Sequence, residues 1–146
     1  MANHKQAAKR ARQSELRRQR NMAVRSKLRT RVRALRYAVE QIHTLAAGKA
    51  IHPQEVDKHL RWITEGKAAD LTKLGYGDLV EAAKGLLKKY DPTAHSGLLR
   101  RLARADLKES VRLLGKAASK GVLHKATASR RISRLNRLVN AVDAAA

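Results

Sequence analysis

Apolar side chains recur every three or four positions over the first third of the chain, a spacing typical of one face of an α-helix. At about 100° per residue they fall within an arc of roughly 80°. The positions on this face are Val24, Leu28, Val32, Leu35, Val39 and Ile42. The pattern predicts one long helix from about Ser14 to Ala47. Gly48 is its expected terminator, because glycine readily adopts the left-handed conformation that follows helix ends.

The last third of the chain predicts two more helices, joined near Gly121, which is expected to cap the first of them. The first carries apolar residues at a spacing of three to five positions, namely Leu98, Leu102, Leu107, Val111, Leu114 and Ala118. The second carries Ile132, Leu135, Leu138, Val139 and Val142 on one side. No stretch of the chain shows the strict alternation of a strand, so we expect an all-α fold.

The middle of the chain is also predicted to be helical. Pro53 suits a first helical turn, and Gly66 is the expected stop of that helix. Asp78 with Glu81 resembles an acidic capping box, which predicts a second helix that ends before Asp91-Pro92. The expected minor core of this middle segment, or its contact with another protein, consists of Trp62, Ile63, Leu86, Leu87 and Tyr90.

Charge divides the chain into three parts. Lysine and arginine number 33 against 12 acids, for a formal net charge of +21. Residues 1–36 hold thirteen cations and one acid, residues 37–99 hold eight of each sign, and residues 100–146 hold twelve cations and three acids. We therefore expect one domain with three segments. These are a basic helix over 1–47, a neutral helical insertion over 48–97, and two further helices over 98–146.

Several classes of function find no support in the sequence. Cysteine is absent, no nucleotide-binding or nucleophile motif is present, and the carboxylates are not paired for acid–base work. His52, Glu55 and His59 are spaced too weakly to predict a metal site. Residues 1–20 lack an apolar core, so no signal peptide or membrane partner is expected. We expect no catalytic residues, no cofactor, no metal and no small-molecule substrate.

The cationic ends predict a polyanionic partner, because a single acid among thirteen cations leaves them without intramolecular partners. Arginine predominates, which suits bidentate contacts to phosphate. Aromatic residues are almost absent from both ends of the chain. We therefore expect contacts to the phosphate backbone and to the shape of a nucleic-acid helix, rather than stacking on bases. Before residue 21 the cations point all around the helix axis, and this part is expected to order only among phosphates. A nucleoid-type DNA-condensing protein is the alternative.

Two blocks of sequence resemble the bacterial small-subunit ribosomal protein S20 family. The first is the opening M-A-N-H-K-Q-A-A-K-R-A-R-Q-S-E, followed by Arg18, Asn21, Arg25-Ser26 and Arg29-Thr30. The second is K-G-V-L-H-K from Lys120, followed by Ala128, Arg130 and Ser133-Arg134-Leu135. The sequence departs from the family pattern at Ala8, Ala126 and Ile132, and in its long middle segment.

The resemblance implies a three-helix bundle whose long basic first helix reaches into folded RNA, with the insertion between the first and second family helices. It implies a structural constituent of the small ribosomal subunit that binds 16S ribosomal RNA directly and supports assembly. Its partners would be that RNA and other small-subunit components, in the cytoplasm and on the ribosome. The expected RNA-binding residues are Lys5, Lys9, Arg10, Arg12, Gln13, Ser14, Arg17, Arg18, Asn21, Arg25, Ser26, Arg29, Thr30, Arg33, Lys120, His124, Lys125, Arg130, Arg131, Ser133, Arg134 and Arg137.

Overall fold

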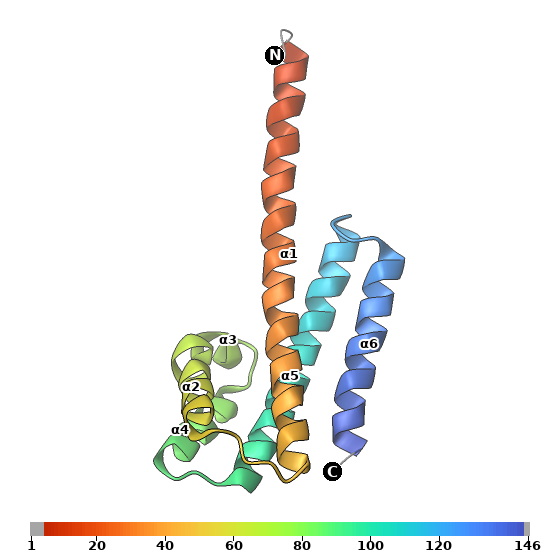
Figure 1. Cartoon of the computed structure of the whole chain (residues 1–146). Coiled ribbons are helices and arrows are strands. Elements are labelled where there is room, and N and C mark those ends of the chain that lie inside the picture. The colour runs from red at the N-terminus through yellow and green to blue at the C-terminus, as the bar shows by residue number, and fades with distance from the viewer. Residues whose placement is uncertain (1–4, 145–146) are drawn as a thin grey trace.

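The structure, a computed structural model, describes residues 5–144, and every regular element in this range is a helix. The all-α prediction is therefore confirmed; residues 1–4 of the family-like opening lie outside the described range. Figure 1 shows one very long helix beside two antiparallel helices, with a group of short helices at its lower end. The elements are α1 (Lys5–Ala46), α2 (Pro53–Arg61), the π-helical turn η1 (Trp62–Gly66), α3 (Ala68–Lys73), α4 (Gly77–Lys88), α5 (Pro92–Ser119) and α6 (Lys125–Ala144).

Helix α1 begins earlier than the apolar pattern indicated. The predicted start near Ser14 is wrong: the helix begins at Lys5, and the Ser14 hydroxyl donates to the carbonyl of Ala11 inside the helix. Alanine, glutamine and arginine fill these first turns, and their high helix propensity extends a helix without any packed face. The predicted end is confirmed, because α1 stops at Ala46 and Gly48 adopts a φ of 69°.

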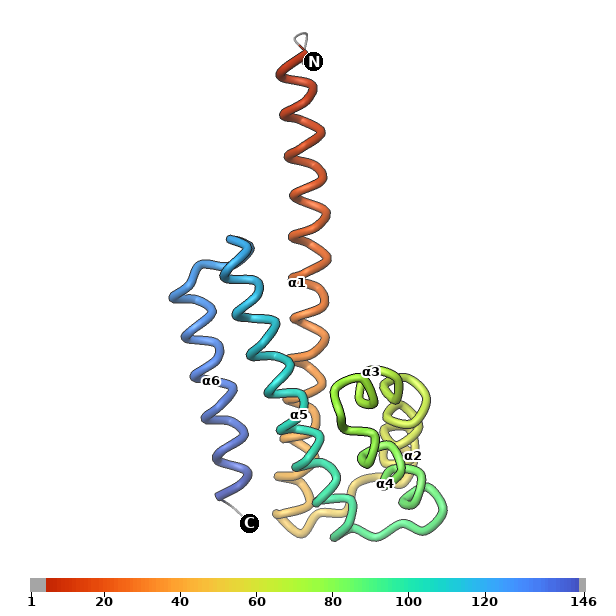
Figure 2. Tube along the Cα trace, turned by 180° about the vertical axis from the view of Figure 1, so that it is seen from behind, coloured from red at the N-terminus to blue at the C-terminus, as the bar shows by residue number. Residues whose placement is uncertain are grey.

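The lower half of α1 packs with α5 and α6 into a three-helix bundle, seen from both sides in Figures 1 and 2. Four of the six predicted apolar positions of α1 are buried in the core, Val32 is partly buried against it, and the partly buried Val24 is not part of it. Ile132, where the sequence departs from the family pattern, packs against this core. The buried members of this bundle core are Leu28, Leu35, Ala38, Val39, Ile42, Leu99, Ala103, Leu114, Leu135, Val139 and Val142.

A second core lies between the short helices and α5. Helix α5 takes part in both cores, because Leu98 and Leu102 face the short helices whereas Leu99 and Ala103 face α1 and α6. The predicted boundary at 97/98 falls inside α5, which begins at Pro92. The buried members of the second core are Ile51, Val56, Leu60, Ile63, Leu71, Leu79, Val80, Ala83, Leu86, Leu98, Leu102 and Ala105.

One detail predicted for the middle segment is wrong. The capping box does not form, because Tyr76 holds the cap position of α4 without a side-chain bond and Asp78 pairs with Arg101 of α5 instead. Of the five residues predicted to form a minor core or a protein contact, Ile63 and Leu86 are buried in the core and the other three are exposed. Those three are Trp62, Leu87 and Tyr90.

Buried charges join the middle segment to the bundle. Both carboxylate oxygens of Asp106 in α5 lie 2.5 Å from the ammonium of Lys67, and both side chains are almost fully buried. Arg31 of α1 completes the cluster: its guanidinium lies 3.8 Å from Asp106 and also pairs with Asp70 of α3. Burial lowers the pKa of Lys67 and raises that of Asp106, while the opposite charge of each partner acts against that shift.

No helix within residues 5–144 is both long and apolar enough to cross a membrane.

Candidate nucleic-acid interface

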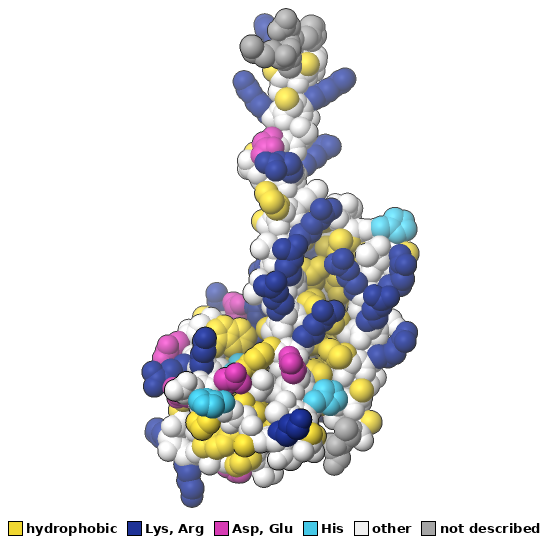
Figure 3. Space-filling model, in the orientation of Figure 1, with side chains coloured by type: hydrophobic (Ala, Val, Ile, Leu, Met, Phe, Trp, Pro, Cys, Tyr) yellow, Lys and Arg dark blue, Asp and Glu magenta, His cyan; other side chains and the backbone are white. Residues whose placement is uncertain are grey.

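The upper half of α1 is a free-standing cationic stalk, here residues 5–22. Figure 3 shows lysine and arginine side chains along this stalk and over the face next to α6, whereas acidic side chains gather mainly around the short helices. All nine predicted RNA-binding residues of the stalk are exposed except Asn21, which is partly buried. The exposed ones are Lys5, Lys9, Arg10, Arg12, Gln13, Ser14, Arg17 and Arg18.

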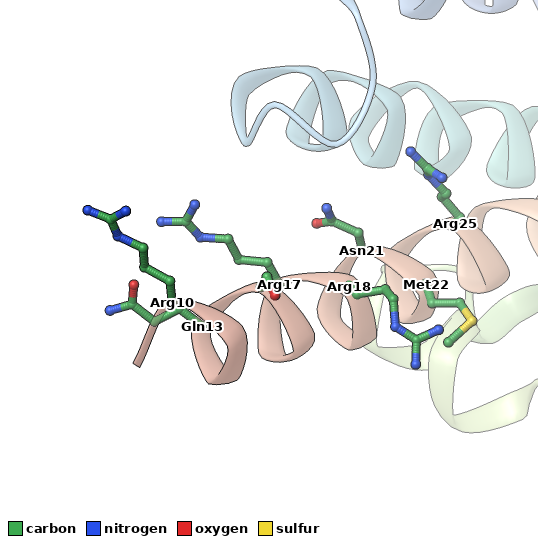
Figure 4. A pocket seen from close by; sticks show the side chains of 8 residues that line it. Arg10, Gln13, Arg17, Arg18, Asn21, Met22 and Arg25 are labelled. Atoms are coloured by element: carbon green, nitrogen blue, oxygen red, sulfur yellow. The ribbon is translucent and has the colours of Figure 1, made fainter. Parts of the chain in front are cut away.

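One side of the stalk gathers several of the predicted residues. In Figure 4 Arg10, Arg17, Asn21 and Arg25 point toward the side of α1 on which the turn between α5 and α6 lies. They are seven, four and four positions apart, which places them along one helix face. They are among the residues that line a shallow depression on the stalk, to which Gln13, Ser14, Arg18 and Met22 also contribute, although Arg18 and Met22 extend to the other side of the helix. The four side chains on this face form a row of hydrogen-bond donors along the helix, an arrangement that could contact successive phosphates of a nucleic-acid backbone.

Arg18 points to the opposite side of the stalk in Figure 4. Its guanidinium donates two hydrogen bonds of 2.8 Å to the carboxylate of Glu15, one turn earlier. The hydrogen bond from Arg18 lowers the pKa of Glu15 to about 2, and Glu15 in turn raises the pKa of Arg18. Among the predicted RNA-binding residues, Arg18 alone has an acidic partner within the described part of the chain.

A groove between α1 and α6 brings together arginines from distant parts of the sequence. Its floor is apolar, and its rims carry six arginines that form no ion pair with any residue described here. The floor consists of Leu28, Val32, Leu123 and Leu135. The rims carry Arg25, Arg29, Arg33 and Arg36 from α1 and Arg131 and Arg134 from α6. We name this feature the arginine groove.

The turn between α5 and α6 closes the upper end of the arginine groove. Gly121, with a φ of 68°, makes the tight reversal that the sequence predicted there. The Arg25 guanidinium donates a 3.4 Å hydrogen bond to the carbonyl of Val122, which ties α1 to this turn. The three predicted residues of the turn, Lys120, His124 and Lys125, are exposed beside it. The two family-like blocks therefore meet in space.

Other predicted residues are exposed but do not line the arginine groove. On α6 the Arg130 guanidinium donates to the Ala126 carbonyl, and Arg137 donates to the Ser133 hydroxyl. On α1 the exposed Thr30 hydroxyl donates to the Ser26 carbonyl.

Arg36 was missing from the predicted residues, although it lines the groove. Its position, three residues after Arg33 and seven after Arg29, places it on the same helix face as those two arginines, and the sequence alone could have shown this.

The histidines weighed for a metal site have other surroundings. The His52 ring accepts a hydrogen bond from the Gln54 backbone amide and so caps α2. His59 is buried between the aromatic rings of Tyr37 and Trp62. Within residues 5–144, no three or more histidine, aspartate or glutamate side chains are grouped so that they could hold a metal ion.

The family model of ribosomal protein S20 matches residues 2–60 and 79–140. Residues 61–78 lie outside the match, a shorter interruption than the predicted insertion over 48–97. The unmatched segment holds η1, α3 and two members of the ionic cluster, the buried Lys67 and the exposed Asp70.

Whole-chain similarity leads to the same family. A small ribosomal subunit protein bS20 of Syntrophotalea carbinolica is 32% identical over 142 residues, which is 97% of this chain and 99% of the relative. The bS20 protein of Desulforapulum autotrophicum is 34% identical over 137 residues, 94% of this chain and 96% of that protein. The bS20 protein of Desulfotalea psychrophila is 45% identical over 64 residues, 44% of this chain and 71% of the relative. No solved structure gives a significant match. On the family match and these near full-length similarities, the chain belongs to the ribosomal protein S20 family.

Proposed function

We propose that the chain is a structural constituent of the small ribosomal subunit that binds 16S ribosomal RNA directly and supports subunit assembly. The observation that carries this proposal is the arginine groove, where two helices far apart in sequence present six arginines without acidic partners in the described structure. The relatives' names, all small ribosomal subunit protein bS20, support the same assignment. We assign the chain no catalytic role.

The chemistry of the interface favours recognition of the RNA backbone. Guanidinium groups match the geometry of phosphate oxygens and donate paired hydrogen bonds to them. No aromatic side chain lines either the groove or the depression on the stalk, so neither offers a platform for stacking bases. Such contacts hold a protein in register on a folded RNA through its shape and its phosphates.

The stalk and the arginine groove fit one continuous path for RNA. The depression on the stalk and the groove share Arg25, which lines both. A folded RNA segment that follows the stalk downward would thus enter the groove beside Lys120, His124 and Lys125. The proposed partners are this RNA and the neighbouring components of the subunit, and the place of action is the cytoplasmic ribosome.

The proposal is tested by the salt dependence of binding to a 16S ribosomal RNA fragment. The logarithm of the affinity should fall steeply and linearly with the logarithm of salt concentration, because each phosphate contact releases counterions. Arg29→Ala and Arg134→Ala should each weaken binding and flatten this slope by about one.

Arg101→Ala is the matched control, because Arg101 is exposed but paired with Asp78 away from the groove. It should leave the affinity and the slope unchanged. Affinity that does not vary with salt would rule out a phosphate clamp, and equal affinity for duplex DNA would favour the DNA-condensing alternative.

A further inference from the structure

The floor of the arginine groove is a feature that phosphate binding alone does not use. Ten residues line the groove, and the four that are not arginines are all aliphatic, namely Leu28, Val32, Leu123 and Leu135. Leu28 and Leu135 are buried, whereas Val32 and Leu123 are only partly buried. Figure 3 shows hydrophobic side chains between lysine and arginine side chains on the face next to α6. An apolar strip is therefore open to solvent between two cationic rims.

The packing of the helices keeps this strip open. Helices α1 and α6 each pack mainly against α5 and contact one another much less. The six guanidinium groups of the rims repel one another, and no acid is present among the ten described residues of the lining to draw them together. The groove has a volume of about 560 Å³, within the range of roughly 300–1,000 Å³ that is typical of small-molecule sites. A single nucleotide therefore fits into it.

The lining of the groove selects the chemistry of its occupant. Arginine side chains only donate hydrogen bonds, and the aliphatic floor neither donates nor accepts them. A fitting ligand therefore brings acceptor atoms to the rims and a flat apolar surface to the floor. A nucleotide combines a phosphate with a base whose faces are apolar, and guanidinium planes can stack on those faces.

A base inside a duplex cannot reach the floor of the groove. It stays stacked between its neighbours, and an RNA helix presents mainly its phosphates, its sugars and the edges of its bases to a bound protein. Such a helix would lie across the rims and leave the apolar strip in water. A nucleotide outside the stack can turn its base toward the floor while the flanking phosphates remain at the rims.

We propose that the arginine groove binds an unpaired nucleotide of its RNA partner, with the base on the apolar floor and the flanking phosphates at the arginine rims. This role rests on the proposed binding of RNA and adds the RNA structure that the groove recognises. Because the floor offers no hydrogen-bond donor or acceptor, it distinguishes an unpaired base from a paired one, but not one base from another.

Two RNA hairpins that differ only in one bulge test this role with the full-length protein. One hairpin carries a single bulged 2-aminopurine in its stem, and the other is fully paired. The bulged hairpin should bind about fivefold more tightly, a difference of ~1 kcal/mol. The emission of 2-aminopurine, which stacking on neighbouring bases quenches, should rise to saturation as protein is added.

Leu123→Gln makes part of the floor polar and leaves all six arginines in place. It should lower the preference for the bulged hairpin to about twofold or less and change the affinity for the paired hairpin by less than about twofold.

The matched control is Leu113→Gln, because Leu113 is also a partly buried leucine packed on the bundle core but does not line the groove. This variant should keep the preference of about fivefold. Circular dichroism confirms that each variant keeps its helices. If Leu123→Gln does not, Val32→Thr takes its place, and it should lower the preference to about threefold or less.

Equal affinity for the two hairpins, or a preference that Leu123→Gln leaves undiminished, would overturn the proposed nucleotide site. An equal loss of preference with Leu113→Gln would overturn it as well. Steeply salt-dependent binding of both hairpins would in these cases leave the proposed phosphate contacts intact. Absence of binding to both hairpins and to the 16S RNA fragment would overturn the proposed function, and the nucleotide site with it.

Discussion

At the scale of single residues, the cations of α1 serve two different purposes. Arg29 is exposed on the rim of the arginine groove and has no acidic partner in the described structure. Arg31, two positions later, has a side chain only 13% exposed and pairs with both Asp70 and Asp106. A rotation of about 200° around the helix axis separates the two side chains. Arg31 was not among the predicted RNA-binding residues, and its surroundings give it a structural role.

Replacing arginine with glutamine should therefore affect stability at position 31 and RNA affinity at position 29. Arg31→Gln should lower the free energy of unfolding by about 1–3 kcal/mol, because it removes one cation from a largely buried ionic cluster. Arg29→Gln should change stability by less than about 0.5 kcal/mol but weaken binding to the 16S RNA fragment. Urea unfolding and filter binding measure the two quantities. Equal destabilisation by both variants would contradict the structural role of Arg31.

The Glu15–Arg18 pair gives a second prediction at this scale. The Glu15 carboxylate, like any exposed carboxylate, is charged at neutral pH, and the two hydrogen bonds that it accepts from Arg18 compete with phosphate for that guanidinium. Glu15→Gln should therefore raise affinity for the RNA fragment by about threefold and steepen the salt dependence by about one unit of slope. An unchanged affinity would show that Arg18 does not contact phosphate. Glu81→Gln is the comparison, because Glu81 forms a similar ion pair with Lys84 on α4. This variant should have no effect on RNA binding.

At the scale of helices, α5 is the element on which both cores depend. Its neighbouring residues Leu98 and Leu99 point into different cores, so the short helices and the bundle are packed on opposite sides of one helix. His95 of α5 and His59 of α2 lie at the lower end of this arrangement, with ring centroids 6.4 Å apart. Both nitrogens of His59 and Nε2 of His95 are buried without a hydrogen-bond partner in the described structure.

This histidine pair makes the packing of α2 on α5 sensitive to acid. Burial, then the charges of His95 and Lys67, lowers the pKa of His59 to about 4 from an ordinary value of 6.5. The unfolded chain therefore binds a proton in this interval that the folded chain excludes. The stability contributed by neutral His59 is complete above pH 6.5 and is lost as pH falls toward 4, by about 3 kcal/mol in total.

Urea unfolding between pH 4 and pH 7 measures this loss. His59→Phe keeps an aromatic ring between Tyr37 and Trp62 but cannot take up a proton. The variant should therefore lose less stability than the unaltered protein over the same interval, with a residual slope from His95, whose pKa burial also lowers. Identical slopes for the two proteins would show that His59 is not the titrating group.

At the scale of the whole molecule, charge and packing are separated along α1. Most arginines of the stalk and all six of the arginine groove have no acidic partner in the described structure, whereas the short helices share a core with α5. In Figure 3 lysine and arginine side chains follow the stalk and the face next to α6, and most acidic side chains of this view lie around the short helices. The middle segment is therefore no loose appendage: it buries apolar side chains and a lysine against the bundle. Its removal should affect stability far more than RNA binding.

Replacing residues 61–78 with a short Gly/Ser linker tests this expectation. The change removes the buried Ile63 and Leu71 and leaves Asp106 without Lys67, so the free energy of unfolding should fall by about 5 kcal/mol or more. Binding to the 16S RNA fragment, measured where the variant keeps its helices, should stay within about threefold, a change of well under ~1 kcal/mol. A tenfold loss of affinity would show that this segment helps to hold the RNA.

The helical class, the end of α1, the apolar face of the bundle and the cationic excess at both ends of the chain could all be read from the amino-acid sequence. These properties depend on residues within one or two helical turns of each other and on the total charge of a segment. Both can be read directly from the order of residues in the chain. The predicted start of α1 failed because its first turns are helical without an apolar face, a case that periodicity cannot detect.

The packing of the helices determines which charged and aromatic residues are paired, buried or free. Arg31 and Arg29 look alike in the sequence, and nothing local shows that Asp70 and Asp106, each more than thirty positions away, face one of them and not the other. Trp62, Leu87 and Tyr90 were predicted to form a minor core or a protein contact, and they are exposed because apolar residues of α5 complete the core of the short helices. Burial and charge compensation are relations between distant residues, and the packing of α5 against both cores establishes them.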